Sequence, residues 1–139
     1  MTDRPLSSHD YRALARFRYA LRVFQRFSED AARSAGLTPA QHQLLLAVRG
    51  WDGPDDLAPT ITDLADRLQL KHHSAVELVQ RATTAGLVVS ATDAADGRRQ
   101  RLELTDLGQA KLTSLSLLHR DELRRFRSEM NDVLRELSE

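Results

Sequence analysis

Hydrophobic residues in the middle of the chain follow two helical repeats with a short polar break between them. Over residues 60–69 the apolar positions have the spacing of one helix face: Ile61, Leu64, Ala65 and Leu68. Residues 72–85 repeat this spacing at Ala75, Leu78, Val79 and Ala82. Two helices joined by so short a turn are typical of a helix-turn-helix.

Signals at the ends of these helices support the same division. Thr60 and Asp63 stand at the spacing of a capping box, with Asp in place of the usual Glu. Gly86 follows the second helix, where a left-handed residue is favoured. Two short strands, 87–91 and 99–104, come next and are joined by a polar tip. A hairpin directly after a helix-turn-helix predicts a wing.

Long helical patterns flank this module on both sides. Residues 9–35 predict one helix, and Thr38 caps another that stops near Gly50. Helical spacing then runs over 106–139, as one helix or as two with a break near Ser128. The predicted fold class is mainly α with a small β-wing: a winged helix-turn-helix plus helical dimerisation arms.

The two terminal arms carry more apolar residues than the module between them can cover. An apolar stripe without a partner in its own chain seeks one elsewhere, so we expect a homodimer with Leu115 and Phe126 important for its stability. The alternative is that the arms fold back into a monomeric core. The predicted organisation is one domain over 1–139, with dimerisation helices at 6–35 and 106–139 and the winged helix-turn-helix at 38–105.

Composition narrows the functional classes. The chain has 139 residues and no cysteine, which excludes disulfides, thiolate metal sites and thiol redox sensing. The five histidines lack metal-ligand spacing, so we expect no metal and no cofactor. There is no long apolar run and no signal-peptide core, so we expect a cytoplasmic protein without membrane contact. No nucleophile elbow, P-loop or dinucleotide fingerprint appears, so we expect no enzyme.

Charge is balanced overall: 20 Lys and Arg face 20 Asp and Glu, for a formal net charge of zero. Basic residues nevertheless cluster at the wing, at Arg98, Arg99 and Arg101. A neutral chain can bind DNA when its cations and helix N-termini face the phosphates. Because the non-specific term depends on phosphate neutralisation, we expect weak binding to non-specific DNA.

The apolar face of the second helix leaves its first turn to enter the major groove. The candidates for contacts with base edges are His72, His73, Ser74 and Glu77. Lys71 is a phosphate contact, and Thr60 and Thr62 are placed to meet phosphate at a helix N-terminus. Arg81 lies too far along the helix for bases, and we expect it in an intramolecular salt bridge.

The wing supplies the remaining candidates for DNA binding. Arg98 at the tip suits a narrow A·T-rich minor groove, where the negative potential is enhanced. Asp96, two residues earlier, is placed to hold that side chain, and Arg99 adds positive charge beside it. The alternative is a tip that is charged only because it is solvated.

The sequence also offers candidates for a small-ligand pocket in the helices before the helix-turn-helix: Arg16, Phe17, Tyr19, His42 and Trp51. Arginine suits a carboxylate and the rings suit an aromatic body. For each of them a core or solvated-face role is the alternative.

Taken in order, several short motifs resemble those of the MarR family of bacterial transcription regulators over nearly the whole chain. The matching segments are Gly36-Leu37-Thr38, Thr62-Asp63-Leu64-Ala65, His73-Ser74-Ala75-Val76, Leu78-Val79-Gln80-Arg81, Gly86-Leu87-Val88, Asp96-Gly97-Arg98 and Leu104-Thr105-Asp106-Leu107-Gly108. One departure is Lys71-His72-His73, which replaces the D-R-S type opening common in that family, so base preference does not carry over.

The resemblance implies a homodimer that binds a pseudo-palindromic site on double-stranded DNA, often as a repressor. It also implies release from DNA by a small aromatic acid or phenol. Because the chain lacks cysteine, the thiol-oxidation branch of the family does not apply. The alternative function is a winged-helix protein-interaction module without its own operator, which the neutral net charge favours.

Overall fold

The computed structural model describes residues 4–137, with the side chain of Asp55 left aside. The chain divides into two compact units, Met1–Ala31 with Ser116–Glu139, and Ala32–Leu115. We call them the arm unit and the winged module. The first and last residues of the predicted domain, and the end of the predicted C-terminal arm, lie outside the described residues.

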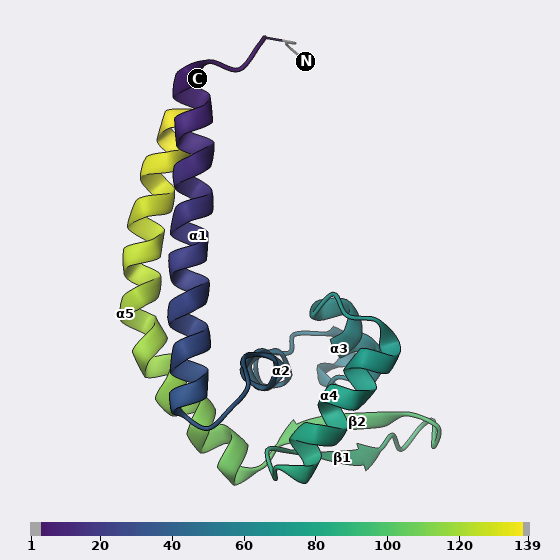
Figure 1. The fold of residues 1–139 in the computed structure, drawn as a ribbon. Helices are drawn as coiled ribbons and strands as arrows, with labels where there is room; N and C mark the ends of the chain where they lie inside the picture. The colour runs from purple at the N-terminus through teal and green to yellow at the C-terminus, as the bar shows by residue number, and fades with distance from the viewer. Residues whose placement is uncertain (1–3, 138–139) are drawn as a thin grey trace. The chain divides into compact units, whose positions relative to one another are not determined.

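The arm unit pairs the two longest helices, α1 (Ser8–Ser34) and α5 (Asp106–Leu137), which lie side by side in Figure 1. Small buried residues of α1, among them Ala13 and Ala20, leave room for the facing helix. The Phe24 and Phe126 rings lie 5.0 Å apart between centroids. The sequence left open a break near residue 128, and the structure shows one continuous helix.

The winged module contains the end of α1, the start of α5 as far as Leu115, and all the elements between them, shown in Figure 1. In chain order these intermediate elements are α2 (Pro39–Arg49), the short 3-10 helix η1 (Pro54–Asp56), α3 (Ile61–Arg67), α4 (His72–Thr84), β1 (Val88–Thr92) and β2 (Gln100–Leu104). The two strands pair antiparallel from Val88↔Leu104 to Thr92↔Gln100. This mainly helical fold with a two-stranded wing confirms the predicted fold class.

The core of the module is made by residues that the periodicity placed inside. Leu64 and Ala65 of α3 are buried, as are Ala75, Val79 and Ala82 of α4, whereas the flanking Ile61, Leu68 and Leu78 are half-buried. The other buried apolar side chains include Leu44, Leu45, Leu87, Leu102, Leu112 and Leu115. The module therefore closes its core with its own residues.

Local chemistry fixes where the helices begin and end. Thr38 caps α2 through a capping box with Gln41, and Thr60 caps α3 in the same way with Asp63. Gly86 takes a φ of +77° after α4, a conformation that glycine adopts without the steric cost of a side chain. These caps confirm the predicted helix boundaries to within about two residues.

The turn between α3 and α4 is tighter than the sequence suggests. Helix α3 ends at Arg67 because Gln69 takes a positive φ of 55°, and Leu70 N–H then donates to the Ala65 carbonyl at 2.8 Å. The predicted helix over 60–69 therefore extended two residues beyond the observed end at Arg67. The result is a compact turn that brings the start of α4 close to α3.

Candidate nucleic-acid interface

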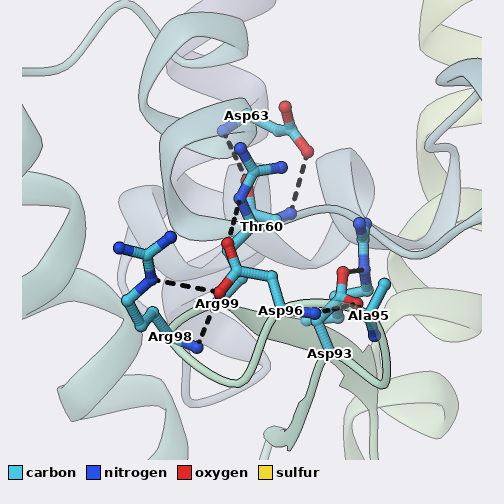
Figure 2. Close-up of polar contacts among 8 residues, drawn as sticks. Thr60, Asp63, Asp93, Ala95, Asp96, Arg98 and Arg99 are labelled. Carbon is cyan, nitrogen blue, oxygen red and sulfur yellow. Dashed lines mark hydrogen bonds and ion pairs between the residues drawn. The ribbon is translucent and has the colours of Figure 1, made fainter.

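The N-terminus of α3 is held in place by reciprocal hydrogen bonds. Asp63 N–H donates to Thr60 Oγ1 at 3.2 Å, and Thr60 N–H donates to Asp63 Oδ2 at 2.9 Å, as Figure 2 shows. Thr60 is buried, whereas Thr62 in the first turn is exposed. Of the two threonines predicted to meet phosphate, Thr62 is the accessible one and Thr60 supports the turn.

The first turn of α4 faces solvent. Lys71, at the N-cap position, makes no capping hydrogen bond with its side chain, so Lys71 does not satisfy the first N–H groups of the helix. His72, His73 and Glu77 are exposed and Ser74 is half-buried. The predicted base-contacting residues therefore occupy one accessible helix start, with the dipole of α4 behind them.

Arg98 at the wing tip is the most exposed of the three wing arginines. Its side chain is 92% exposed, and Nε donates to Asp96 Oδ1 at 3.2 Å. Asp96 Oδ1 also accepts the Arg98 backbone N–H at 3.0 Å, and Oδ2 lies 3.6 Å from Arg99 Nε. Figure 2 shows Asp96 between the two arginines. The prediction that Asp96 holds Arg98 is confirmed as a contact.

Arg101 differs from its two neighbours. Its Nε donates to Asp93 Oδ2 at 2.6 Å and its Nη1 donates to the Ala58 carbonyl at 2.6 Å. The side chain is only 19% exposed. Counting Arg101 with the basic cluster of the wing was therefore wrong, because its charge is used inside the module.

A cleft of about 310 Å³ joins the start of α3, the start of α4 and the wing. Its lining residues are Thr60, Ile61, Thr62, Asp63, His72, Arg98, Arg99 and Gln100. Five of the ten predicted DNA-binding residues thus line one concave surface: Thr60, Thr62, His72, Arg98 and Arg99. Of the others, Lys71, His73 and Ser74 lie at the start of α4 beside His72, Glu77 follows in the second turn, and Asp96 contacts Arg98 and Arg99.

Arg81 does not form the salt bridge that the sequence suggested. It is exposed on α4, and within residues 4–137 no ion pair to it is found. It therefore remains accessible to solvent in the last turn of that helix.

The predicted ligand-binding residues are divided between different places. In the winged module, His42 is buried, and Trp51 lines a cavity of about 580 Å³ with Val48, Arg49 and Leu102 among its other walls. In the arm unit, Arg16 and Tyr19 line a smaller cavity of about 240 Å³, and Phe17 is half-buried. The five residues do not share a single pocket.

Hydrogen-bond and ion-pair partners lower the pKa of two carboxylates in the winged module, Asp93 and Asp52. Hydrogen bonds from the Ala95 N–H and the Arg101 guanidinium hold the pKa of Asp93 below its ordinary value. Arg67 lowers the pKa of Asp52 through a hydrogen bond and its charge, and the same guanidinium lies 4.6 Å from the Trp51 ring centroid. Both acids are thus held in the ionised form.

Among the described residues, no three histidine or acidic side chains gather closely enough to hold a metal ion. None of the helices within residues 4–137 has both the length and the apolar character needed to cross a membrane.

Comparison with known proteins gives consistent results. The family model described as the MarR family matches residues 35–99. A crystal structure of a MarR family transcription regulator is similar with a TM-score of 0.71 and 25% identity, covering 85% of this chain and 75% of that one.

Two further solved structures share the fold. AbsC, a MarR family transcriptional regulator from Streptomyces coelicolor, has a TM-score of 0.73 at 19% identity over 97% of this chain and 95% of its own. S. aureus MepR in a complex with DNA has a TM-score of 0.70 at 20% identity, over 86% and 88% respectively. No curated protein matches the sequence significantly.

Proposed function

We propose that this chain, whose residues 35–99 match the MarR family model, is a DNA-binding transcription regulator of that family and acts as a homodimeric repressor of a pseudo-palindromic operator. The observation that carries the proposal is the cleft in which the α3 N-terminus, His72 and the wing arginines meet. That combination of helix start and cations suits a DNA backbone passing between two grooves. We treat the chain as one regulatory domain of the cytoplasm without a catalytic role, cofactor or metal.

Each winged module would read one half-site. The first turn of α4 would lie in the major groove, with His72, His73, Ser74 and Glu77 toward base edges and Lys71 toward phosphate. Arg98 would enter the adjacent minor groove. Because the net charge of the chain is zero, this local grouping of cations must supply the attraction to phosphate.

The arm unit supports a homodimer. It leaves large apolar side chains exposed over the described residues of α1 and α5, including Leu14, Tyr19, Val23, Leu117, Leu118, Leu123 and Leu134. A second copy of the same unit would cover them, as matching patches do in twofold dimers. Leu115 cannot be one of these contacts because the chain buries it already, and Phe126 is half-buried against Phe24.

An effector would act by changing the separation of the two recognition helices. Two half-sites about one helical turn apart require a separation of about 34–36 Å, so a small displacement is decisive. We propose a small aromatic acid, for which the Trp51 cavity is the better-supported location. Its lining includes the Trp51 indole, Val48, Leu102 and Arg49, together with the acids Asp52, Asp56 and Glu103. A carboxylate ligand would pair with the Arg49 guanidinium, which now donates to Gln109 Oε1 at 3.1 Å. The ligand must bind the DNA-free arrangement more tightly to shift the equilibrium.

The decisive test is fluorescence anisotropy with labelled DNA from upstream of the gene itself, against a shuffled duplex of equal length. Saturable binding to the first with at least about a hundredfold preference supports the function. Footprinting should protect two half-sites about 10 bp apart. Equal binding to both duplexes would favour the protein-interaction module instead.

The effector is tested separately with the bound complex. Salicylate and other aromatic acids should release the DNA and change the fluorescence of Trp51, the single tryptophan of the chain. If these acids have no effect while peroxide or Zn²⁺ releases the DNA, the proposed regulation is wrong.

A further inference from the structure

The wing contains an internal ion pair that its DNA-facing arginines do not share. We propose that Asp93 and Arg101 are positioning residues for DNA binding, which clamp the wing to the segment before α3 and so set where Arg98 and Arg99 stand. The inference rests on the DNA-binding function proposed above. It assigns a role to two residues that do not themselves touch DNA.

Arg101 forms one end of the clamp through two short hydrogen bonds that diverge. Nε binds Asp93 Oδ2 at 2.6 Å, at the tip end of the hairpin, and Nη1 binds the Ala58 carbonyl at 2.6 Å, in the segment that leads into α3. The backbone of Arg101 forms an isolated antiparallel bridge to Thr60. One residue thus joins the wing to the start of α3 through both its side chain and its backbone.

Asp93 forms the other end and shapes the tip. Its Oδ1 accepts the backbone N–H groups of Ala95 at 2.7 Å and Asp96 at 3.2 Å, which is an Asx turn, while Oδ2 binds Arg101. Only 8% of the Asp93 side chain is exposed. A single carboxylate therefore fixes the tip backbone with one oxygen and the anchor with the other.

The contacts continue without a gap from the anchor to the DNA-facing cations. The clamp orders the Asp96 backbone, and the Asp96 carboxylate in turn contacts Arg98 and Arg99. A hairpin tip without such support would lose more conformational entropy when it enters a groove, and this cost lowers affinity. Because the clamp already orders the tip in the free protein, less conformational entropy is lost when DNA binds.

The register of the hairpin explains why the two residues meet. Asp93 N–H donates to the Arg99 carbonyl, so Asp93 lies opposite Arg99 and diagonal to Arg101 on the same face. The clamp requires this spacing together with the Ala58 carbonyl on the neighbouring segment. Arg98 and Arg99 differ from Arg101 because both pair with the Asp96 carboxylate at the tip.

Arg101→Gln tests the proposal by separating positioning from phosphate contact. A positioning role predicts about a tenfold loss of operator affinity, the cost of ordering two long side chains anew. The slope of log affinity against log salt should stay unchanged, because no phosphate contact is lost. Arg98→Ala is the comparator, since it should lower that slope by about 0.9.

Two more variants keep the test informative. Asp93→Asn retains an oxygen for the Asx turn but loses the charged partner of Arg101, so it should reproduce the Arg101→Gln loss. The double variant should then cost little more than either single one, because both remove one interaction. Arg67→Gln removes an exposed ion pair to Asp52 in the same module and should leave affinity unchanged.

Amide hydrogen exchange supplies a readout that needs no DNA. In Arg101→Gln the N–H groups of Ala95 and Asp96 should exchange faster, while those of α4 stay protected. A salt slope lowered by about 0.9 in Arg101→Gln would make Arg101 a phosphate contact and overturn the proposal. Unchanged affinity and exchange would overturn it too, whereas a wild-type protein that fails to bind its operator would refute the proposed function instead.

Discussion

The two units of the chain differ in how they cover their large apolar residues. The winged module fully buries Leu44, Leu45, Leu64, Leu87 and Leu102, although it leaves others exposed, among them Leu46 and Leu57. In the arm unit Leu118 is 57% exposed, and Leu117, Leu123 and Leu134 are exposed as well. The winged module thus has a core of its own, whereas the arm unit leaves these leucines in contact with water, which is the basis of the homodimer proposed above.

Breaking the arm surface should have the largest effect on function. We expect Leu118→Glu to yield a monomer in light scattering, because a charge cannot be buried in an apolar interface without a partner. Operator affinity should fall by about 10²–10⁴, since two linked half-site contacts become two independent ones. Glutamate is a good helix former, so α5 itself should persist.

Leu57→Glu is the matched control for this experiment. Leu57 is about as exposed as the arm leucines but lies in the loop before α3 of the winged module. Its replacement should leave the dimer mass unchanged. A dimeric Leu118→Glu protein would show that the leucines of the arm unit are not the dimer contact.

Leu64 belongs to the buried core of the winged module. Leu64→Ala removes a fully buried side chain of α3 and should lower the free energy of unfolding by about 2–5 kcal/mol. Leu46→Ala, an exposed leucine of α2, should change it by no more than about 0.5 kcal/mol. Urea unfolding of the two variants measures the difference. Similar losses in both would contradict a core restricted to the buried set.

The same contrast explains which features could be predicted from the sequence. Helical periodicity and caps are local signals, so the boundaries of α2 and α4, the capping box of Thr60 and the positive φ of Gly86 were predicted. The burial of Leu115 was not, because periodicity marks an apolar face without telling which unit covers it. Only the structure therefore distinguishes the buried leucines of the terminal helices from the exposed ones.

The sequence also could not predict in which direction each arginine side chain of the wing points. Three arginines within four positions look alike as a basic cluster, yet Arg101 is bound to Asp93 and the Ala58 carbonyl. Asp93 is visible in the sequence as an acid near these arginines, but its pairing with Arg101 follows only from the register of the hairpin. The contact with Ala58 depends on a segment distant in sequence and was outside the reach of local patterns.

Gly108, in the first turn of α5, lies close to the backbone of Leu87 within the winged module. A Cβ at this position would lie 2.1 Å from the Leu87 carbonyl oxygen, so Gly108→Ala forces the backbone apart. We expect a loss of about 1–3 kcal/mol in the free energy of unfolding. Gly97→Ala at the wing tip is the control, because its Cβ would meet Thr92 at an ordinary 4.0 Å. Equal thermal midpoints for both variants would contradict the close approach at Gly108.

The smallest expected changes in stability and DNA affinity concern Thr60 and Thr62, at the start of α3. Thr60→Ala removes the cap and should cost about 1 kcal/mol of stability, because the Asp63 N–H loses its acceptor. Thr62 is exposed, so Thr62→Ala should leave stability unchanged but weaken DNA binding if its hydroxyl meets phosphate. Thr60→Ser restores the hydroxyl and should recover the stability lost in Thr60→Ala. Thermal unfolding and anisotropy on the same three proteins decide this. If Thr60→Ala unfolds at the wild-type temperature, the capping box contributes nothing, and if Thr62→Ala binds as tightly as wild type, the phosphate must meet the backbone rather than this side chain.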